Sequence, residues 1–490
     1  METCLVVVIV SLCLCILFMK FKSFSSRPLP PCHLHIPLIS DITWLRASFL
    51  ELHLILHNLI AKHGPIFTLR FFSTPFVFIA DHSLAHQALI QNGAVFANRP
   101  KTLSSGQLNI SSSSYGATWR LLRRNLSSTV LHPSFSGIRK RVLHDLLNRL
   151  KNDVAETSHS VVMVKDQVQH AMFTLILFMC FGEAVERHKI QDIERIQRSL
   201  VNGVGRFSVL SFLPNVFARV LFPTRWHELL QLRKAQKDVF VRFIKARKGA
   251  TVNIHDHGGA ICYVDTLLNL RLPEGDSALD EGDVVSLCSE FLTSGMDTTS
   301  TALEWVMANL VKHPHVQRRV VEEIGEVVVG EREVKEEDLN KLPYLKAVIL
   351  EGLRRHPPSH LLMPHAVSED VVLNGYLVPK NGVVNFAVAE MGCDPKVWED
   401  PMAFKPERFL RTEQFDITGS RDIKMMPFGA GRRACPAHIL AMHHLQYFVA
   451  NLVWNFEWKA FDEGNVDLST KQEFTVVMKH PLRARVYPRF

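Results

Sequence analysis

One short segment near the carboxyl end, Phe428-Gly-Ala-Gly431-Arg-Arg433-Ala-Cys435, constrains this chain more than any other feature. Cys435 is followed by Pro436 and by an apolar-periodic run over residues 437–456. Because proline is favoured at the first position of a helix, Cys435 is predicted at or near the N-cap of a long helix. The unpaired N–H groups and the positive dipole end at such a position stabilise a thiolate relative to a thiol.

The residues around the cysteine indicate the kind of partner it meets. Gly429 and Gly431 permit either a positive φ or a close approach of the backbone to a flat molecule. Arg433, two residues before the sulfur, is placed to meet an anion on that molecule. A thiolate and a cation that face a large planar dianion indicate haem. The alternative is a buried free cysteine at a helix start.

The segment matches the pattern Phe-x-x-Gly-x-Arg-x-Cys, and the chain therefore resembles the cytochrome P450 superfamily of haem-thiolate proteins. The resemblance implies that Cys435 is the axial ligand of the iron in haem b, with Phe428, Gly431 and Arg433 beside the cofactor. Ala437 stands where this superfamily usually has glycine, and its methyl group could crowd the porphyrin slightly. Residues 451–458 look most like those of plant microsomal A-type members, with family eighty-nine the nearest group.

The body of the chain is expected to form one large, mainly α domain with small β-sheets. No repeat and no long Gly/Ser linker interrupts residues 60–490. Helical periodicity covers residues 116–150, 165–182, 226–247, 280–311 and 339–355, and short β-like pieces occur at 65–80, 371–387 and 472–487. The resemblance implies a cytochrome P450 fold, with a catalytic domain over residues 41–490.

The amino-terminal residues are predicted to anchor the chain in a membrane. Residues 3–19 are 17 uncharged, mostly apolar residues, and Lys20, Lys22 and Arg27 follow. As a helix they would span roughly 25 Å, close to the hydrocarbon thickness of the endoplasmic reticulum membrane. The positive flank predicts a transmembrane helix over residues 1–22, a proline-containing linker over 23–40 and a cytosolic body. A cleaved signal peptide is the alternative, but the basic n-region and the cleavage site are missing.

Charge and cysteine content agree with this location. The formal net charge of +8 suits an acidic protein partner or anionic membrane lipid, although a solvated surface without a partner explains the charge equally well. The sequence lacks the basic stripe that nucleic-acid binding needs. The nine cysteines are odd in number and scattered, which indicates a reducing compartment. Two groups of cysteine and histidine, around residues 32–35 and 435–444, lack the paired spacing of zinc ligands.

The longest predicted helix carries Gly295-Met296-Asp297-Thr298-Thr299 in its middle. These polar residues are poor helix formers, because their side chains compete for backbone hydrogen bonds. Taken alone, two polar residues turned to solvent explain the pentapeptide equally well. The resemblance implies a catalytic pair, in which Thr298 hydrogen-bonds the oxygen that is being activated and Asp297 relays protons.

Two further sets of residues complete the expected site. Glu351 and Arg354 are three residues apart on one helix face, and Arg408 follows in Pro406-Glu407-Arg408-Phe409. The resemblance implies that these three form a buried ion network that braces the cysteine loop. It also implies that Trp119, Arg123 and Arg433 bind the haem propionates, with His365 as a weaker contact where many relatives carry arginine.

The implied function is a membrane-anchored monooxygenase that inserts one oxygen atom from O2 into a lipophilic small molecule. The chain has no Gly-x-Gly-x-x-Gly turn and no P-loop, so NADPH and flavin are expected on a separate NADPH–cytochrome P450 reductase. Three alternatives stay open: a haem-thiolate isomerase or dehydratase that needs no O2, a non-catalytic haem-binding protein, and a membrane scaffold without haem. By resemblance the substrate pocket would be shaped by residues 104–114, 205–221, 290–297, 361–367 and 474–477, which do not identify the substrate.

Overall fold

The computed structural model describes residues 28–32, 52–71, 74–100, 107–130, 135–156, 161–182, 187–211, 215–249, 261–328, 330, 333–410, 415–462 and 465–490. The predicted membrane helix and most of the linker lie outside these residues. Within the described ranges, no helix is both long enough and apolar enough to cross a membrane. The division into residues 1–22, 23–40 and 41–490 stays a prediction.

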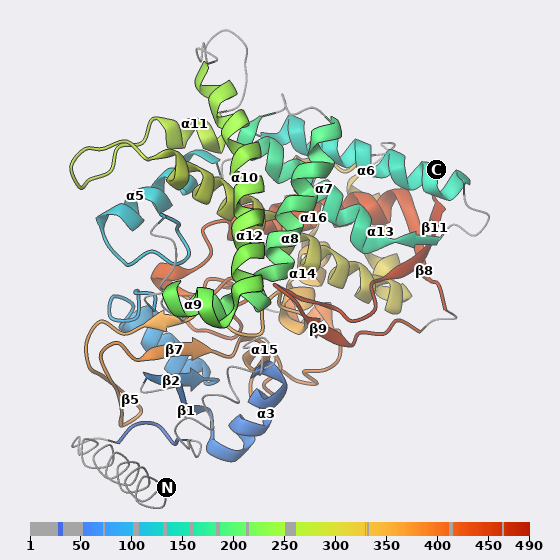
Figure 1. Cartoon of the computed structure of the whole chain (residues 1–490). Coiled ribbons are helices and arrows are strands. Elements are labelled where there is room, and N and C mark those ends of the chain that lie inside the picture. Colours follow the sequence, from blue (N-terminus) through green and yellow to red (C-terminus); the bar gives the residue numbers. More distant parts are fainter. Residues whose placement is uncertain are drawn as a thin grey trace, which may run out of the picture.

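The described chain is mainly helical, as expected (Figure 1). Its helices are α3 (Leu52–His63), α4 (His82–His86), α5 (Ala117–Asn125), α6 (Ser136–Glu156), α7 (Val164–Phe181), α8 (Arg187–Ser211), α9 (Asn215–Leu221), α10 (Pro223–Gly249), α11 (Tyr263–Leu268), α12 (Glu281–Lys312), α13 (Pro314–Val327), α14 (Pro343–Arg355), α15 (Val388–Gly392) and α16 (His438–Asn455). Short 3-10 helices lie at η5 (Glu336–Lys341), η6 (Pro406–Phe409) and η7 (Gly431–Arg433), and π-helical turns at η2 (Gln87–Gln91) and η3 (Leu126–Val130). The helix expected over 116–150 is divided among α5, η3 and α6.

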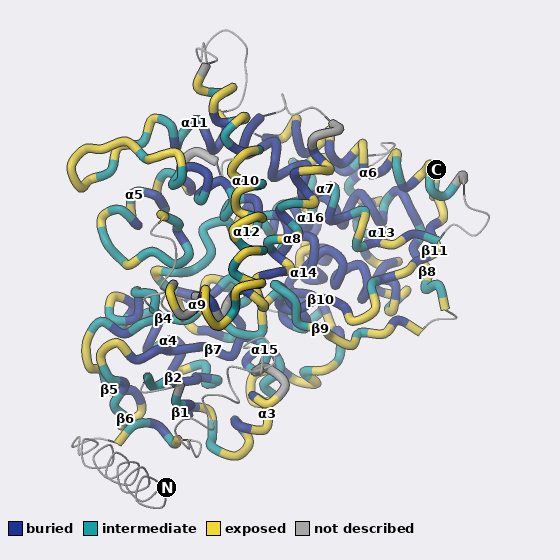
Figure 2. Tube along the Cα trace, in the orientation of Figure 1, coloured by how far each residue is buried: buried dark blue, intermediate teal, exposed yellow. Residues whose placement is uncertain are grey.

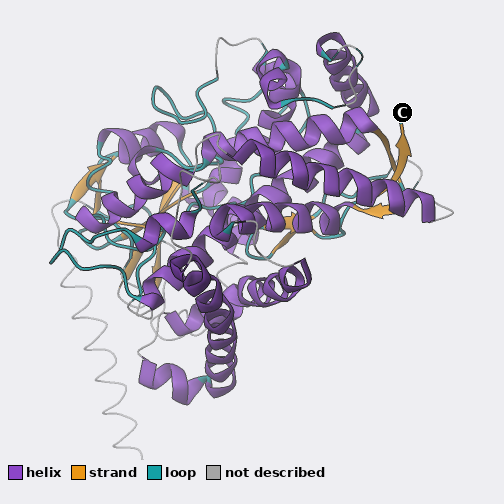
Figure 3. Ribbon diagram, turned by 90° about the horizontal axis from the view of Figure 1, so that it is seen from above, coloured by secondary structure: helices purple, strands orange, loops and turns teal. Residues whose placement is uncertain are grey.

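Long helices lie side by side in the helical part of the fold (Figure 3). Among them, helix α12 packs most extensively against α7, and both are labelled near the middle of Figure 1. It begins where the Asp280 carboxylate accepts the N–H of Asp283 at 2.6 Å, and it ends just before α13, which starts with Pro314. From residue 296 to residue 311 almost every side chain of α12 is buried, as are most side chains of α7 (Figure 2). A helix that is buried all round belongs to the core, so α12 provides a rigid base for the polar residues in its middle.

The strands form small sheets, the largest of which lies apart from most of the long helices (Figure 1). That sheet has the order β1-β2-β7-β4, with β1 (Ile66–Phe71) antiparallel to β2 (Thr74–Ile79), β2 parallel to β7 (Val383–Phe386), and β4 (His365–Ala366) antiparallel to β7. The other strands are β3 (Val161–Met163), β5 (Val371–Leu373), β6 (Tyr376–Val378), β8 (Phe456–Ala460), β9 (Thr470–Gln472), β10 (Val476–Met478) and β11 (Arg483–Pro488).

The β-like piece expected over residues 65–80 forms two antiparallel strands, β1 and β2. Thr74 and Pro75 already belong to β2, where Pro75 pairs with Arg70 of β1. The pairing of β2 with β7 starts only at Phe76. Proline is tolerated at Pro75 because no β7 residue needs its missing N–H.

An ion cluster joins α6, η5 and α16 on the side of the fold that carries the start of α16. The Glu336 carboxylate accepts both Arg139 Nε at 2.8 Å and His443 Nε2 at 3.0 Å. Burial raises the pKa of Glu336, but the hydrogen bonds and charges of His443 and Arg139 outweigh it and hold that pKa at about 2. The Arg139 side chain is fully buried, so this cluster clamps η5 onto two helices.

Candidate active site around Cys435

The loop that carries Cys435 is held by its own backbone. The N–H of Cys435 donates to the carbonyl of Phe428 at 2.8 Å, and the N–H of Ala434 donates to the carbonyl of Gly431 at 3.1 Å. Gly431 has a φ of 68°, and a Cβ there would lie 2.0 Å from the carbonyl oxygen of Leu89. Glycine is therefore required at 431 because the loop passes against the backbone of η2.

Helix α16 begins later than the proline predicted. Its N-cap is Ala437 and its first residue is His438, so Cys435 and Pro436 precede the helix in a turn. The backbone N–H of Ala437 hydrogen-bonds to the sulfur of Cys435. Burial raises the pKa of the Cys435 thiol, while this N–H and the charge of Arg123 act in the opposite direction. Ala437 has a φ of −98°, which any L-residue adopts, so the backbone does not require glycine at that position.

Three guanidinium groups gather beside this loop. Arg433 donates Nε to the carbonyl of Ala97 at 2.6 Å and Nη2 to the carbonyl of Ser113 at 2.6 Å. Arg123 donates Nη2 to the carbonyl of Ala434 at 2.7 Å. Arg99 contacts the carbonyls of residues 111, 363 and 364.

The indole of Trp119 contacts two members of this arginine cluster, which we define as Arg99, Arg123 and Arg433. The guanidinium carbon of Arg433 is 4.4 Å from the ring centroid and that of Arg123 is 5.4 Å away. The indole N–H donates to the carbonyl of Ile110 at 3.0 Å. Trp119 therefore orients the two guanidinium groups through cation–π contacts with its ring, while its indole N–H is bonded to the backbone.

The arginine cluster lacks negative partners in the described part of the chain. Each contact of Arg99, Arg123 and Arg433 there is with a carbonyl or a ring, and none is with a carboxylate. Burial lowers the pKa of Arg99 to about 9, with help from Arg433, and burial and Arg123 lower that of Arg433 to about 10. Buried cations without carboxylates need an anionic ligand. These groups fit haem. The Cys435 thiol, which accepts a backbone N–H, is suited to the iron, and the arginine cations without carboxylate partners are suited to the two propionates.

His365 does not support the expected propionate contact. Its Nδ1 lies 2.7 Å from the carbonyl oxygen of Phe96, and because a carbonyl only accepts, Nδ1 carries the proton. Burial and then the charge of Arg99 lower the pKa of His365 to about 3, so the ring is neutral. The remaining Nε2 is an acceptor and cannot donate to a carboxylate. Arg99, to which no sequence motif points, is a cation close to both His365 and Arg433.

The structure turns the side chains of Asp297 and Thr298 to different sides of α12. Successive helix positions are about 100° apart. Thr298 Oγ1 donates to the carbonyl of Ser294 at 2.6 Å, whereas Asp297 Oδ2 accepts the hydroxyl of Thr475 at 2.9 Å. Burial raises the pKa of Asp297, and the bond from Thr475 opposes it. The Thr475 hydroxyl also lies 2.9 Å from that of Thr301, so Asp297 ends a buried chain of hydroxyl groups that leads to the loop before β10.

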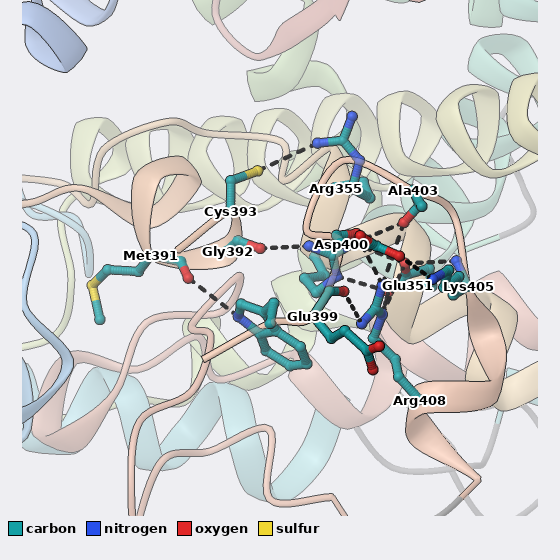
Figure 4. A network of polar contacts seen from close by, with 12 residues as sticks. Glu351, Arg355, Met391, Gly392, Cys393, Glu399, Asp400, Ala403, Lys405 and Arg408 are labelled. Atoms are coloured by element: carbon teal, nitrogen blue, oxygen red, sulfur yellow. Dashed lines mark hydrogen bonds and ion pairs between the residues drawn. The ribbon is translucent and has the colours of Figure 1, made fainter. Parts of the chain in front are cut away.

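Glu351, Arg354 and Arg408 come together in one buried ion network (Figure 4). Arg354 grips Glu351 with Nε at 2.7 Å and Nη2 at 2.8 Å, and Arg408 Nε reaches Glu351 at 3.1 Å. Arg354 also donates to the carbonyl of Gly392 at 2.6 Å, and Glu351 accepts the backbone N–H of Lys405 at 2.9 Å. The network thus ties α14 to α15 and to the segment 399–408 that precedes the cysteine loop.

Comparison with known proteins agrees with this geometry. The family model described as Cytochrome P450 matches residues 30–487. The chain is 47% identical to Cytochrome P450 89A9 of Arabidopsis thaliana, over 99% of both chains. It is 31% identical to Isoflavone 3'-hydroxylase of Medicago truncatula, over 96% of this chain and 94% of the relative.

A zebra fish cytochrome P450 solved with progesterone shares the fold, with a TM-score of 0.76 and 24% identity over 89% of this chain and 99% of that one. These similarities confirm the predicted fold class and the resemblance carried by the cysteine loop. The chain therefore belongs to the cytochrome P450 family of haem-containing monooxygenases, and it fits the plant A-type members of family eighty-nine.

Proposed function

We propose that the chain is a haem b monooxygenase of the endoplasmic reticulum membrane, anchored by residues 1–22, with its catalytic domain in the cytosol. The uncharged residues 3–19 and the positive charges after them support this orientation. The formal net charge of the chain, +8, also suits a catalytic domain that lies near anionic lipid.

The arginine cluster beside Cys435 is the observation that carries the proposal. Cys435 would bind the iron as a thiolate, stabilised by the N–H of Ala437 and by Arg123. Arg99, Arg123 and Arg433 would pair with the propionates and exchange carbonyl contacts for charge-assisted hydrogen bonds. When bound, haem supplies the activation of O2, one atom of which enters the substrate while the other is reduced to water.

The polar residues of α12 would serve proton delivery. The Thr298 hydroxyl donates to the carbonyl of Ser294, and in the presence of haem it would serve as the donor to the oxygen that is being activated. Asp297 keeps a carboxyl group with a raised pKa inside the fold, where Oδ2 accepts the Thr475 hydroxyl, and this carboxyl group would hold a proton for transfer. The two side chains would act in sequence, since they face different sides of the helix.

Electrons would come from NADPH through a separate NADPH–cytochrome P450 reductase, with no nicotinamide or flavin on this chain. Arg432, which is exposed on η7 next to the cysteine loop, and Lys424 provide basic docking charges for an acidic partner. The substrate would be a lipophilic small molecule. Relatives named as isoflavone and flavonoid hydroxylases support this class without identifying the compound.

The reduced carbon-monoxide difference spectrum of membranes that contain the full-length chain tests the haem assignment. A strongly red-shifted Soret band is expected for the native chain, and Cys435→Ala should lose it. The matched control is Cys393→Ala, which removes a partly exposed thiol near the ion network and should keep the band. A thiolate band that survives in Cys435→Ala would refute Cys435 as the ligand.

Reductase-dependent turnover tests the role of Thr298. Thr298→Ala removes the hydroxyl and should raise the release of hydrogen peroxide per NADPH consumed, while Thr298→Ser should restore coupling. Unchanged coupling in Thr298→Ala would remove the proposed role. Product formation without NADPH and reductase would favour the isomerase or dehydratase alternative.

A further inference from the structure

We propose that Glu290 of α12 is a positioning residue that holds the segment 107–116 and, through one peptide group, sets the arginine cluster for its anionic ligand. In the sequence, Glu290 is only the first residue of the range 290–297 that is expected to help shape the substrate pocket. The holding of the segment stands on the contacts alone, whereas the effect on the ligand rests on the proposed haem function.

Both carboxylate oxygens of Glu290 are occupied by consecutive backbone N–H groups. Oε2 accepts the N–H of Ile110 at 2.6 Å, and Oε1 accepts the N–H of Ser111 at 2.6 Å. Hydrogen bonds to an ionised acceptor are the stronger class, and two of them fix the orientation of the segment. Burial raises the pKa of Glu290, and its bonds to Ser111 and Ile110 lower it. With both oxygens engaged, Glu290 is unsuited to bind a substrate directly.

The opposite side of the same backbone faces the arginine cluster. The carbonyl of Ile110 accepts Arg433 Nη1 at 3.2 Å and the indole N–H of Trp119 at 3.0 Å. The carbonyl of Ser111 accepts Arg99 Nε at 2.9 Å. The arginine cluster therefore hydrogen-bonds to the carbonyls of Ile110 and Ser111, the same two residues whose N–H groups donate to Glu290.

One peptide group lies directly between the two charges. It joins residues 110 and 111, so its N–H points to the Glu290 carboxylate and its carbonyl accepts the Arg433 guanidinium. A peptide dipole with an anion at its N–H end and a cation at its C=O end is stabilised at both ends, and each bond polarises the other. Removing the anion should therefore loosen the carbonyl that positions Arg433.

A second carboxylate holds the segment, but not this peptide group. Asp283, two turns earlier on α12, accepts the N–H of Leu108 at 2.8 Å. Its contact leaves the peptide between residues 110 and 111 untouched. Glu290, and not Asp283, is thus the α12 carboxylate that contacts the peptide group between residues 110 and 111, whose carbonyl accepts Arg433.

Hydrogen–deuterium exchange on the full-length protein as purified, in lipid nanodiscs, tests the first step. Glu290→Gln keeps the shape but offers one acceptor oxygen for two N–H groups, so amides 110 and 111 should exchange on the order of tenfold faster. The control is Glu281→Gln, the same change on an exposed residue of the first turn of α12, which should leave both amides unchanged. Wild-type exchange at both amides in Glu290→Gln would overturn the proposal.

Glu290→Asp covers the case in which Glu290→Gln fails to fold. It keeps the charge and both oxygens on a shorter side chain, so its amides should exchange more slowly than in a Glu290→Ala chain. Equal exchange in the aspartate and alanine variants would overturn the role of the carboxylate.

The rate of haem transfer to excess apomyoglobin tests the second step. Glu290→Gln should release haem several-fold faster than the native chain, and Arg433→Ala should do the same. In the double variant the Glu290→Gln effect should largely vanish, because residues that act through one contact are not additive. Effects that simply multiply would refute the link through Arg433. Failure of the haem proposal itself appears separately, as a missing thiolate band with intact effects on amide exchange.

Discussion

Neutralising Glu351 should destabilise the protein far more than neutralising Glu407, which lies only on the rim of the same region. Glu351 is fully buried, Arg354 is 1% exposed, and Arg408 and the N–H of Lys405 share the same carboxylate. Glu351→Gln leaves these donors with one neutral acceptor, and breaking one partner of a buried ion pair costs about 3–5 kcal/mol.

The expected shift in melting temperature follows from the chain length. An unfolding entropy of about 2.1 cal/mol/K per residue gives about 1 kcal/mol/K for 490 residues. Glu351→Gln should therefore lower the midpoint by about 3–5 °C. Glu407 pairs with Arg319 at the surface, with side chains 44% and 49% exposed, so Glu407→Gln should cost less than about 1 °C.

The assay is thermal unfolding of the native chain and both variants by far-UV circular dichroism, at one scan rate because large proteins unfold irreversibly. A midpoint for Glu351→Gln that falls no further than that for Glu407→Gln would refute the argument from burial. A normal carbon-monoxide spectrum at low temperature in both variants would agree with a structural role of the network.

Three further predictions concern the cysteine loop, the arginine cluster and pH. Gly431→Ala places a Cβ 2.0 Å from a backbone oxygen at a φ of 68° and should sharply reduce the yield of folded protein, whereas Gly116→Ala, with open space around it, should express normally in the same immunoblot. Arg433→Ala should speed haem loss relative to Arg124→Ala, an exposed arginine of the same helix as Arg123, and equal rates would count against propionate binding. The pKa of Glu336 is depressed in the folded chain to about 2 from 4.5, so its stabilising effect is present above pH 4.5 and is lost as the pH falls toward about 2. The melting midpoint of Glu336→Gln should accordingly depend less on pH over that window than the native midpoint.

Features that depend on neighbouring residues were predictable from the sequence. The acidic start of α12 and Pro314 after it set both ends of that helix, because caps and prolines act on the adjacent backbone. Gly429 and Gly431 were expected to permit either a positive φ or a close approach of the backbone to a flat molecule, and both adopt a positive φ. Mainly helical architecture followed from periodicity, which burial of one helix face imposes.

At the start of α16, Cys435 lies near the N-cap as predicted, but the helix begins two residues later than Pro436 favoured. Pro436 favoured a helix beginning at once, but the chain makes a turn first, and the N–H of Ala437 is thereby left to bond the sulfur of Cys435. The preference of proline for a helix start is weaker than the contacts that place the loop against η2. His365 shows the same limit, because its Nδ1–H donates to the carbonyl of Phe96, a contact that the local sequence does not reveal.

By itself the sequence determined the cysteine, its loop, the polar centre of α12 and the family to which the chain is similar, since each is written in residues a few positions apart. Only the tertiary structure decided that Arg99 joins Arg433, which is 334 positions away, and that Glu290 holds the peptide between them and α12. The physical reason is that a guanidinium or a carboxylate has the same local sequence signature whether it faces water or a buried backbone. Its burial and its partners are set by how distant segments pack.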